Sequence, residues 1–177
     1  MSALQDVLAA AHYAAEKHAD HRRKGGEPYV NHLVEVAYLV STALSEPDAN
    51  LVIAAFLHDT IEDTGVTAAE LTERFGQDVT DLVLEVTDDK SLAPEVRKRL
   101  QVEHAPKLSI RAQTIKLADK ISNLRSILSS PPPDWSYERK KQYFEWGKQV
   151  IDGLSASNAT LKKEFEKTYQ RFGEVRR

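Results

Sequence analysis

The chain contains one stretch in which an apolar run leads directly into an imidazole and three carboxylates: Ala54-Ala55-Phe56-Leu57-His58-Asp59-Thr60-Ile61-Glu62-Asp63. The first four residues are too apolar for a surface and predict a helix that enters the core. If that helix continues, His58 and Glu62 share one face, and Asp59 and Asp63 share the adjacent face. Burying such groups is costly unless they are paired or bind a cation. The stretch therefore predicts a metal site, with further ligands supplied by other parts of the chain.

Length and composition are those of an ordinary globular protein. A chain of 177 residues fits a single domain over 1–177 with a substantial core. Its 24 Lys and Arg against 27 Asp and Glu give a net charge of −3, so no overall positive field favours nucleic acid. The absence of cysteine excludes disulfides and thiolate ligands, and it fits a cytoplasmic location. No apolar run reaches the ~20 residues of a membrane helix, and the first residues do not resemble a signal peptide.

Helical periodicity runs through almost the whole chain. Thr67-Ala68-Ala69-Glu70 is a capping box that starts a helix, and Gly76 ends it. The short apolar run Leu82–Val86 is also compatible with a strand. The predicted helices lie at about 4–15, 32–44, 47–63, 67–76, 79–86, 94–105, 110–128, 137–154 and 158–172. We expect a single all-α domain with eight to ten helices around a metal site.

Two further residues are candidate ligands beside His58 and Asp59. His32 opens the second predicted helix, and Asp119 lies in an apolar-faced helix where a carboxylate is unexpected. Two imidazoles and two carboxylates form a mixed nitrogen and oxygen set that suits Mn²⁺, Fe²⁺ or Co²⁺ better than structural zinc. Four ligands on an octahedral ion leave two positions, for water and for a phosphate oxygen. This arrangement is the one that metal-assisted phosphoester hydrolysis needs.

Each candidate ligand also has a purely structural explanation. A histidine at a helix start is more often a cap or a surface residue, and the His58-Asp59 dipeptide alone is common. Asp119 could instead pair with Lys116, Lys120 or Arg125. The order and apolar setting of the four positions favour the metal site, but spacing alone leaves both interpretations open.

The local sequence around these positions resembles the hydrolase domain of RelA/SpoT-type alarmone enzymes, within the HD superfamily of metal-dependent phosphohydrolases. The resemblance covers about residues 4–172 and is closest to small stand-alone hydrolases of the metazoan SpoT homologue type. The matching segments are Gly26-Glu27-Pro28-Tyr29-Val30-Asn31-His32, Leu57-His58-Asp59-Thr60-Ile61-Glu62-Asp63-Thr64, Glu85-Val86-Thr87-Asp88-Asp89-Lys90-Ser91-Leu92, Ile115-Lys116-Leu117-Ala118-Asp119-Lys120 and Tyr143-Phe144-Glu145-Trp146.

The resemblance implies hydrolysis of guanosine 3′,5′-bis(diphosphate) and its pentaphosphate relative to GDP or GTP and pyrophosphate. It implies that a single Mn²⁺ ion is held by the ligand set His32, His58, Asp59 and Asp119. Glu62 and Asp63 match the family's catalytic carboxylate pair, which orients and deprotonates the attacking water. The chain lacks the extra histidine of the His-Asp-x-Gly-His form, and for that reason we expect one metal ion.

The resemblance also implies contacts to the nucleotide. Arg23 and Lys24 match a basic pair near the guanine, although a solvated basic loop needs no ligand. Asn123 lies four residues after Asp119 and points toward the same site, and Tyr143 matches a residue at the sugar or phosphate. Trp135 is interpreted as core packing. The cations expected to neutralise the distal diphosphates are Lys90, Lys98 and Arg99, although most charges of that helix are expected to face solvent.

Other functions remain open at the level of sequence. The same metal chemistry could remove the 2′-phosphate of NADPH or act on other nucleotides, and a non-catalytic nucleotide-binding or metal-binding module is a third reading. The intact ligand set and the Glu62-Asp63 pair favour an enzyme. No synthetase or regulatory region is recognised, so we expect the protein to degrade the alarmone without making it. The oligomeric state cannot be read from these patterns.

Overall fold

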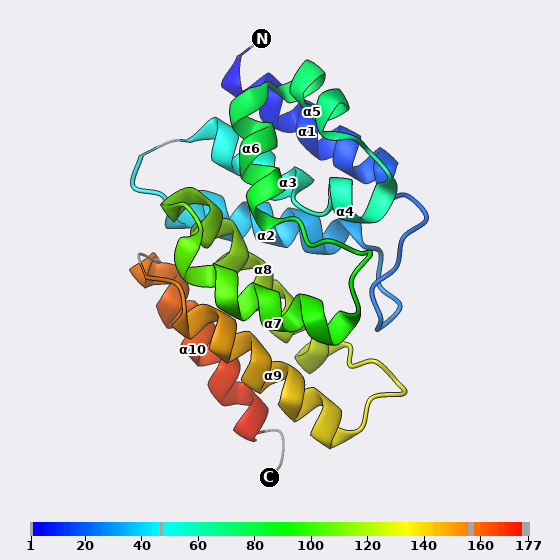
Figure 1. The fold of residues 1–177 in the computed structure, drawn as a ribbon, viewed down its shortest axis with the longest axis vertical. Coiled ribbons are helices and arrows are strands. Elements are labelled where there is room, and N and C mark those ends of the chain that lie inside the picture. Colours follow the sequence, from blue (N-terminus) through cyan, green and yellow to red (C-terminus); the bar gives the residue numbers. More distant parts are fainter. Residues whose placement is uncertain (1, 47, 156–157, 175–177) are drawn as a thin grey trace.

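The computed structural model describes residues 2–46, 48–155 and 158–174, so the predicted helix start at Pro47 lies outside the described residues. Within these ranges the chain forms ten α-helices, one short 3₁₀ turn and no strand (Figure 1). The helices are α1 Ala3–Lys17, α2 Val30–Ala43, α3 Ala49–Leu57, α4 Thr60–Thr64, α5 Ala68–Phe75, α6 Gln77–Val86, α7 Pro94–His104, α8 Ile110–Ser129, α9 Tyr137–Asp152 and α10 Ala159–Glu174, with the 3₁₀ turn at Ala105–Lys107. The predicted all-α fold is confirmed, and Leu82–Val86 is helical.

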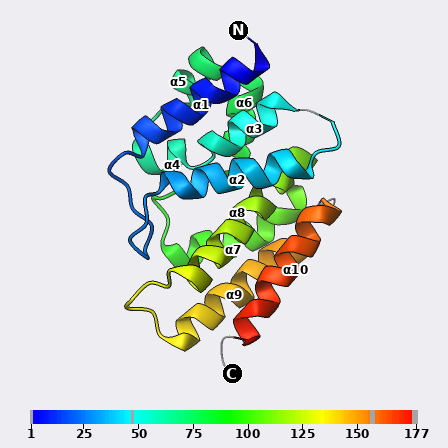
Figure 2. The ribbon, with the colours of Figure 1, turned by 180° about the vertical axis from the view of Figure 1, so that it is seen from behind.

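Helix α8 is the centre of the arrangement. Its residues 112–122 are all buried, and it packs against α2 and α3 on one side and α9 and α10 on another (Figures 1 and 2). The helices α1, α5 and α6 gather around α3 at the N-terminal end of the molecule. A helix that is surrounded in this way can present a polar side chain only to an internal cavity or to a buried partner. The polar residues of α8 are therefore the first place to look for a site.

Helix ends follow the capping signals of the sequence. The side chain of Thr67 accepts a hydrogen bond from the Glu70 N–H, as the predicted capping box requires at the N-terminus of α5. The Glu70 carboxylate turns instead to the Tyr13 hydroxyl on α1, at 2.6 Å. Gly76 ends α5 with a φ of 87°, a conformation that favours glycine. None of the helices in the described residues is long and apolar enough to cross a membrane.

The third predicted helix is not continuous, which corrects the sequence prediction. Helix α3 ends at Leu57, and the short α4 begins at Thr60, with His58 and Asp59 in the turn between them. Asp59 and Asp63 keep their helical spacing, because the Asp63 N–H donates to the Asp59 carbonyl at 2.9 Å. His58 and Glu62 instead lie on opposite sides of the break. In the turn, His58 Nε2 and Asp59 Oδ2 lie 3.1 Å apart.

Candidate active site

Four side chains from three parts of the chain converge between α2, the α3–α4 turn and α8. The Nε2 atom of His32 lies 3.5 Å from Asp59 Oδ2 and 3.4 Å from Asp119 Oδ1. The two imidazole Nε2 atoms, of His32 and His58, are 3.3 Å apart. His58 Nε2 also lies 3.9 Å from Asp119 Oδ1. The structure thus brings together all four candidate ligands that the sequence pointed to.

The partners of the outer ring nitrogens define the tautomers of both histidines. His58 Nδ1 lies 2.8 Å from the Ala55 carbonyl, which can only accept, so this nitrogen carries the proton. The Ser122 hydroxyl donates to Glu35 and therefore accepts from His32 Nδ1, at 2.8 Å. With these protons on Nδ1, each imidazole would turn an Nε2 lone pair inward whenever a metal ion takes the place of a second proton. This is the orientation in which histidine binds a metal.

The chemistry of these four side chains shows that a cation would fit among them. Two Nε2 lone pairs and two carboxylate oxygens face one another at contact distance in a buried space, which is unfavourable unless a cation lies among them. The pKa of His58 reflects the same negative charge. Burial alone would lower this pKa, but the Asp59 and Asp119 carboxylates outweigh burial and raise it to about 9. The donor set of imidazole nitrogens and carboxylate oxygens, with no sulfur, suits a divalent metal ion.

Outer groups hold the ligand carboxylates in place. The Tyr29 hydroxyl donates to Asp59 Oδ2 at 2.7 Å. The carboxylate of Asp119 accepts from Asn123 at 2.6 Å and from Lys120 at 3.2 Å. Although burial opposes ionisation, the two histidines hold the pKa of Asp59 well below its usual range, and Lys120 and the histidines do the same for Asp119. Both carboxylates are therefore charged at neutral pH.

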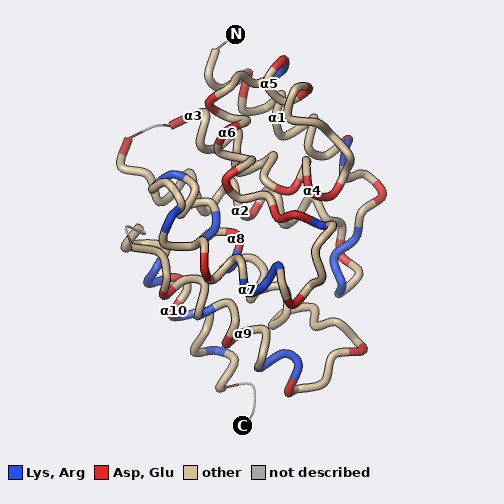
Figure 3. The backbone as a smooth tube through the Cα atoms, in the orientation of Figure 1, with Lys and Arg blue, Asp and Glu red and all other residues tan. Residues whose placement is uncertain are grey.

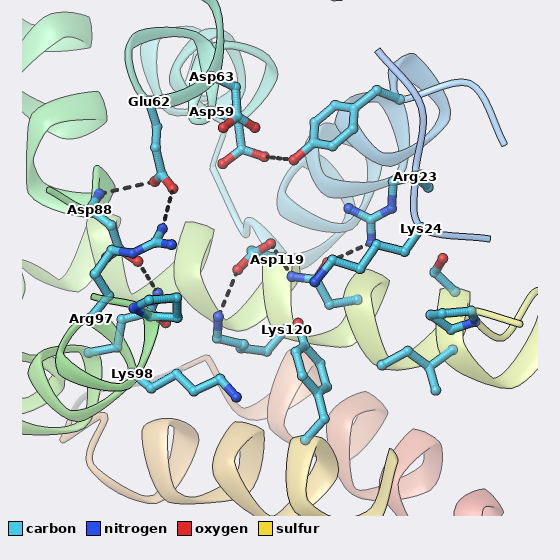
Figure 4. A pocket seen from close by; sticks show the side chains of 18 of the residues that line it. Arg23, Lys24, Asp59, Glu62, Asp63, Asp88, Arg97, Lys98, Asp119 and Lys120 are labelled. Atoms are coloured by element: carbon cyan, nitrogen blue, oxygen red, sulfur yellow. Dashed lines mark hydrogen bonds and ion pairs between the residues drawn. The ribbon is translucent and has the colours of Figure 1, made fainter. Parts of the chain in front are cut away.

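Glu62 and Asp63 lie one turn beyond the ligands, at the wall of the same cavity (Figure 4). Glu62 Oε2 accepts from the Asp88 N–H at 3.1 Å, and Glu62 Oε1 lies 3.6 Å from Arg97 Nη1. Burial and the nearby Asp59, Asp88 and Asp63 carboxylates raise the pKa of Glu62 to about 7, although the Asp88 N–H opposes this shift. Asp63 pairs with Lys90. The two carboxylates thus have different partners, and the pKa of Glu62 lets it exchange a proton near neutral pH.

A cavity of about 480 Å³ opens beside these groups, within the range of a nucleotide pocket. In Figure 3 the basic segments of the loop after α1 and of α7 lie near the acidic segment at α4. The predicted substrate residues that line the cavity are Arg23, Lys24, Lys90, Lys98, Asn123 and Tyr143. Arg99 does not line it; this side chain is largely exposed and lies 3.4 Å from Glu103.

The basic loop is held against the rest of the protein rather than free in solvent. Arg23 donates to Asn123 Oδ1 at 2.6 Å, which links the loop to the residue beside Asp119. A side chain at Gly25 would clash with the Ser130 carbonyl, so only glycine permits this close approach. Burial and the neighbouring cations Arg139, Lys98 and Arg23 lower the pKa of Lys24. Such a gathering of cations is stabilised by an anionic ligand.

Several cavity residues escaped the sequence reasoning. Arg97 was hidden in a charged run that resembled a solvated face, yet it reaches Glu62. Trp135, interpreted as core, is buried but also lines the cavity, with Lys24 Nζ 5.0 Å from its ring centroid. The sequence did carry a signal for Lys116 and Lys120, because two lysines flank Asp119 in an otherwise apolar helix. Both are buried and line the cavity.

Comparison with known families agrees with this geometry. The model of the HD domain matches residues 10–143, which include the four converging side chains. A solved structure described as a metazoan ortholog of SpoT that hydrolyzes ppGpp superimposes with a TM-score of 0.90 and 44% identity. The match covers 95% of this chain and 96% of that one. The chain therefore belongs to the HD domain family.

Within that family, the relatives carry one shared name. Proteins called guanosine-3′,5′-bis(diphosphate) 3′-pyrophosphohydrolase MESH1 are 45% identical in Drosophila melanogaster and 44% identical in Homo sapiens. The alignments cover 91% and 94% of this chain, and the same shares of the two relatives. The resemblance to the metazoan SpoT homologue type is thus confirmed over nearly the whole chain.

Proposed function

We propose that this protein is a metal-dependent guanosine-3′,5′-bis(diphosphate) 3′-pyrophosphohydrolase that degrades the tetraphosphate and pentaphosphate alarmones. The observation that carries the proposal is that one cavity contains three groups of side chains. These are four converging metal donors, the Glu62-Asp63 pair and a cationic wall formed by Arg23, Lys24 and Lys98. The names and the high coverage of the relatives support the same substrate. Because nucleotides of this class are made and used inside the cell, we place the reaction in the cytoplasm.

We propose Mn²⁺ as the ion and one ion per chain. His32, His58, Asp59 and Asp119 would hold it, and a mixed set of two nitrogens and two oxygens suits Mn²⁺. When bound, the ion supplies Lewis acidity that polarises a phosphoryl oxygen and makes water more acidic. The remaining chemistry belongs to the side chains of the protein.

In the proposed reaction, water attacks the phosphorus next to the 3′ oxygen of the nucleotide. Glu62 accepts the proton of that water, a role for which its pKa of about 7 is suited. The bond between this phosphorus and the 3′ oxygen breaks, pyrophosphate is released, and the 3′ oxygen leaves with a proton to give GDP or GTP. Asp63, held by Lys90, orients the water from the neighbouring position.

The cationic wall would bind the nucleotide. Lys24 and Lys98 offer ammonium groups to the diphosphates, and Arg23 offers a planar guanidinium to the base. Asn123 and Tyr143 would contact the ribose, since both line the cavity beside Asp119. A ribose carrying a phosphate monoester, such as the 2′-phosphate of NADPH, would meet the same groups. The alternative activity is therefore removal of that phosphate.

The test is to incubate the purified protein with guanosine tetraphosphate and with NADPH, each with Mn²⁺ and with chelator. The products are then separated by ion-exchange chromatography. GDP plus pyrophosphate, formed only with metal, is the expected result. Cleavage of NADPH alone, or of neither compound, would overturn the proposed substrate.

A further inference from the structure

Lys116 is a buried cation that the proposed reaction does not use. Its side chain is 8% exposed in the middle of α8, and its ammonium donates to the Val86 carbonyl at 2.9 Å. Burial and the neighbouring Lys120 lower the pKa of Lys116, so keeping a charge here is unfavourable. The obvious partner, Asp119, lies three residues away but is paired with Lys120 instead. The ligand helix therefore carries a second lysine that is directed elsewhere.

The partner of Lys116 is the carbonyl at the end of α6. Val86 is the last residue of that helix, where carbonyls lack partners within the helix and a cationic donor is favourable. An exposed lysine could cap a helix end without the penalty of burial. The burial of Lys116 is better explained by the segment 87–90 that follows Val86, because this segment contacts the carboxylates of Glu62 and Asp63.

Two residues after Val86, the backbone of Asp88 contacts Glu62. The Asp88 N–H donates to Glu62 Oε2 at 3.1 Å, and the Asp88 carboxylate accepts from Gln101 on α7. Lys90, two residues further along, pairs with Asp63. The segment 87–90 therefore contacts both members of the carboxylate pair, and its position determines where they point.

The anchors of this segment differ in strength. Helix α7, which supplies Gln101, is fully described and contains no buried residue, so it is less deeply packed than α8. Helix α8, which supplies Lys116, is buried through its central part. The firm anchor of segment 87–90 is therefore the one on α8, the same helix that carries Asp119.

We propose that Lys116 is a positioning residue, which fixes the end of α6 so that the Asp88 N–H holds Glu62 in its working orientation. Helix α8 thereby carries the metal ligand Asp119 and, through Lys116, also positions the proton acceptor Glu62. The inference rests on the proposed function for its effect on turnover, but its effect on the Asp88 N–H is independent of any substrate.

The test uses Lys116→Met, with the exposed Lys163→Met on α10 as the matched control. Steady-state kinetics with the alarmone and Mn²⁺, bound-metal analysis and amide hydrogen exchange of Asp88 by NMR are measured on each protein. We expect Lys116→Met to lower kcat on the order of 10- to 100-fold with KM and bound metal nearly unchanged. We expect Asp88 exchange to accelerate on the order of tenfold. The control should match the parent protein in every measurement.

Three results would overturn the inference: an unchanged kcat and Asp88 exchange rate, a parallel loss of bound metal, or a rise in KM alone. If the parent protein cleaves no alarmone, the proposed function fails, yet the Asp88 exchange rate still decides the role of Lys116. If Lys116→Met does not fold, Lys116→Gln is measured in its place, because its shorter polar side chain keeps a polar group in the cavity but cannot donate from the position of the ammonium to the Val86 carbonyl. An unchanged kcat and an unchanged Asp88 exchange rate in that variant would then refute the positioning of Glu62 by Lys116.

Discussion

Removing the Tyr29 hydroxyl is expected to weaken metal binding without changing a ligand. In Tyr29→Phe the ring keeps its stacking on His18, at 5.0 Å between centroids, and its edge contact with His32, at 5.6 Å. The variant loses a 2.7 Å hydrogen bond to Asp59 Oδ2, a carboxylate oxygen that lies within 3.5 Å of both imidazole Nε2 atoms. The substitution therefore isolates the effect of orienting one ligand.

The size of the effect depends on the nature of this bond. A hydrogen bond to a charged acceptor contributes roughly 1.5–3 kcal/mol, and each ~1.4 kcal/mol is a factor of ten in a dissociation constant. Removing a group that orients a metal ligand generally weakens metal binding by about 10- to 100-fold, which agrees with this range. We therefore expect the Kd for Mn²⁺ to rise about 10- to 100-fold in Tyr29→Phe.

The assay is competition for Mn²⁺ between the protein and a chromogenic chelator, followed by kcat at saturating Mn²⁺. Tyr38→Phe is the control, because Tyr38 is 63% exposed on the outer face of α2. It should leave the Kd unchanged. A Kd for Tyr29→Phe within about twofold of the parent value would show that this hydroxyl does not orient the ligand.

Three further substitutions have measurable outcomes. Burial lowers the pKa of His18 to about 4. In the unfolded chain His18 binds a proton below pH ~6.5, whereas in the folded chain it stays neutral until pH ~4. The free energy of unfolding should therefore fall by about 3 kcal/mol over this interval. His18→Phe should flatten that fall in urea unfolding with chelator at pH 7.5 and pH 4.5, and an unflattened profile would contradict the assignment. Phe144→Ala should lower the free energy of unfolding by about 3–5 kcal/mol, because the ring is 1% exposed and stacks on Phe172; a loss below ~1 kcal/mol would count against this packing. Lys24→Met should raise KM on the order of tenfold with little change in kcat, whereas Lys163→Met should not, and an equal KM in both would argue against the cationic wall.

The helices could be predicted from sequence because their signals are local. Apolar residues at helical spacing marked most of the helices, and caps such as Thr67 fixed several ends. The break between Leu57 and Thr60 had no such signal, since neither glycine nor proline interrupts the run. The break lies where His58 and Asp59 converge on His32 and Asp119, and such a tertiary arrangement leaves no trace in the local periodicity.

The site shows the same division between local and tertiary information. The four ligands were accessible to sequence reasoning because a histidine or an aspartate beside apolar helix is conspicuous. Arg97 was not, because a charge in a highly charged helix carries no such contrast, and only the fold brings it to Glu62. Tyr29 was missed for a similar reason, since its role depends on a hydrogen bond from the start of α2 to Asp59 in the α3–α4 turn.

We assign His32, His58, Asp59 and Asp119 to binding the ion. Glu62 is assigned to accepting the proton of the attacking water, and Asp63 to orienting that water. The decisive measurement is alarmone turnover together with bound Mn²⁺, on the same preparations of His58→Ala and of the double variant Glu62→Ala, Asp63→Ala. We predict that the double variant retains the ion and loses turnover, whereas His58→Ala loses both. Equal loss of metal in the two proteins, or full turnover in the double variant, would contradict the assignment of roles.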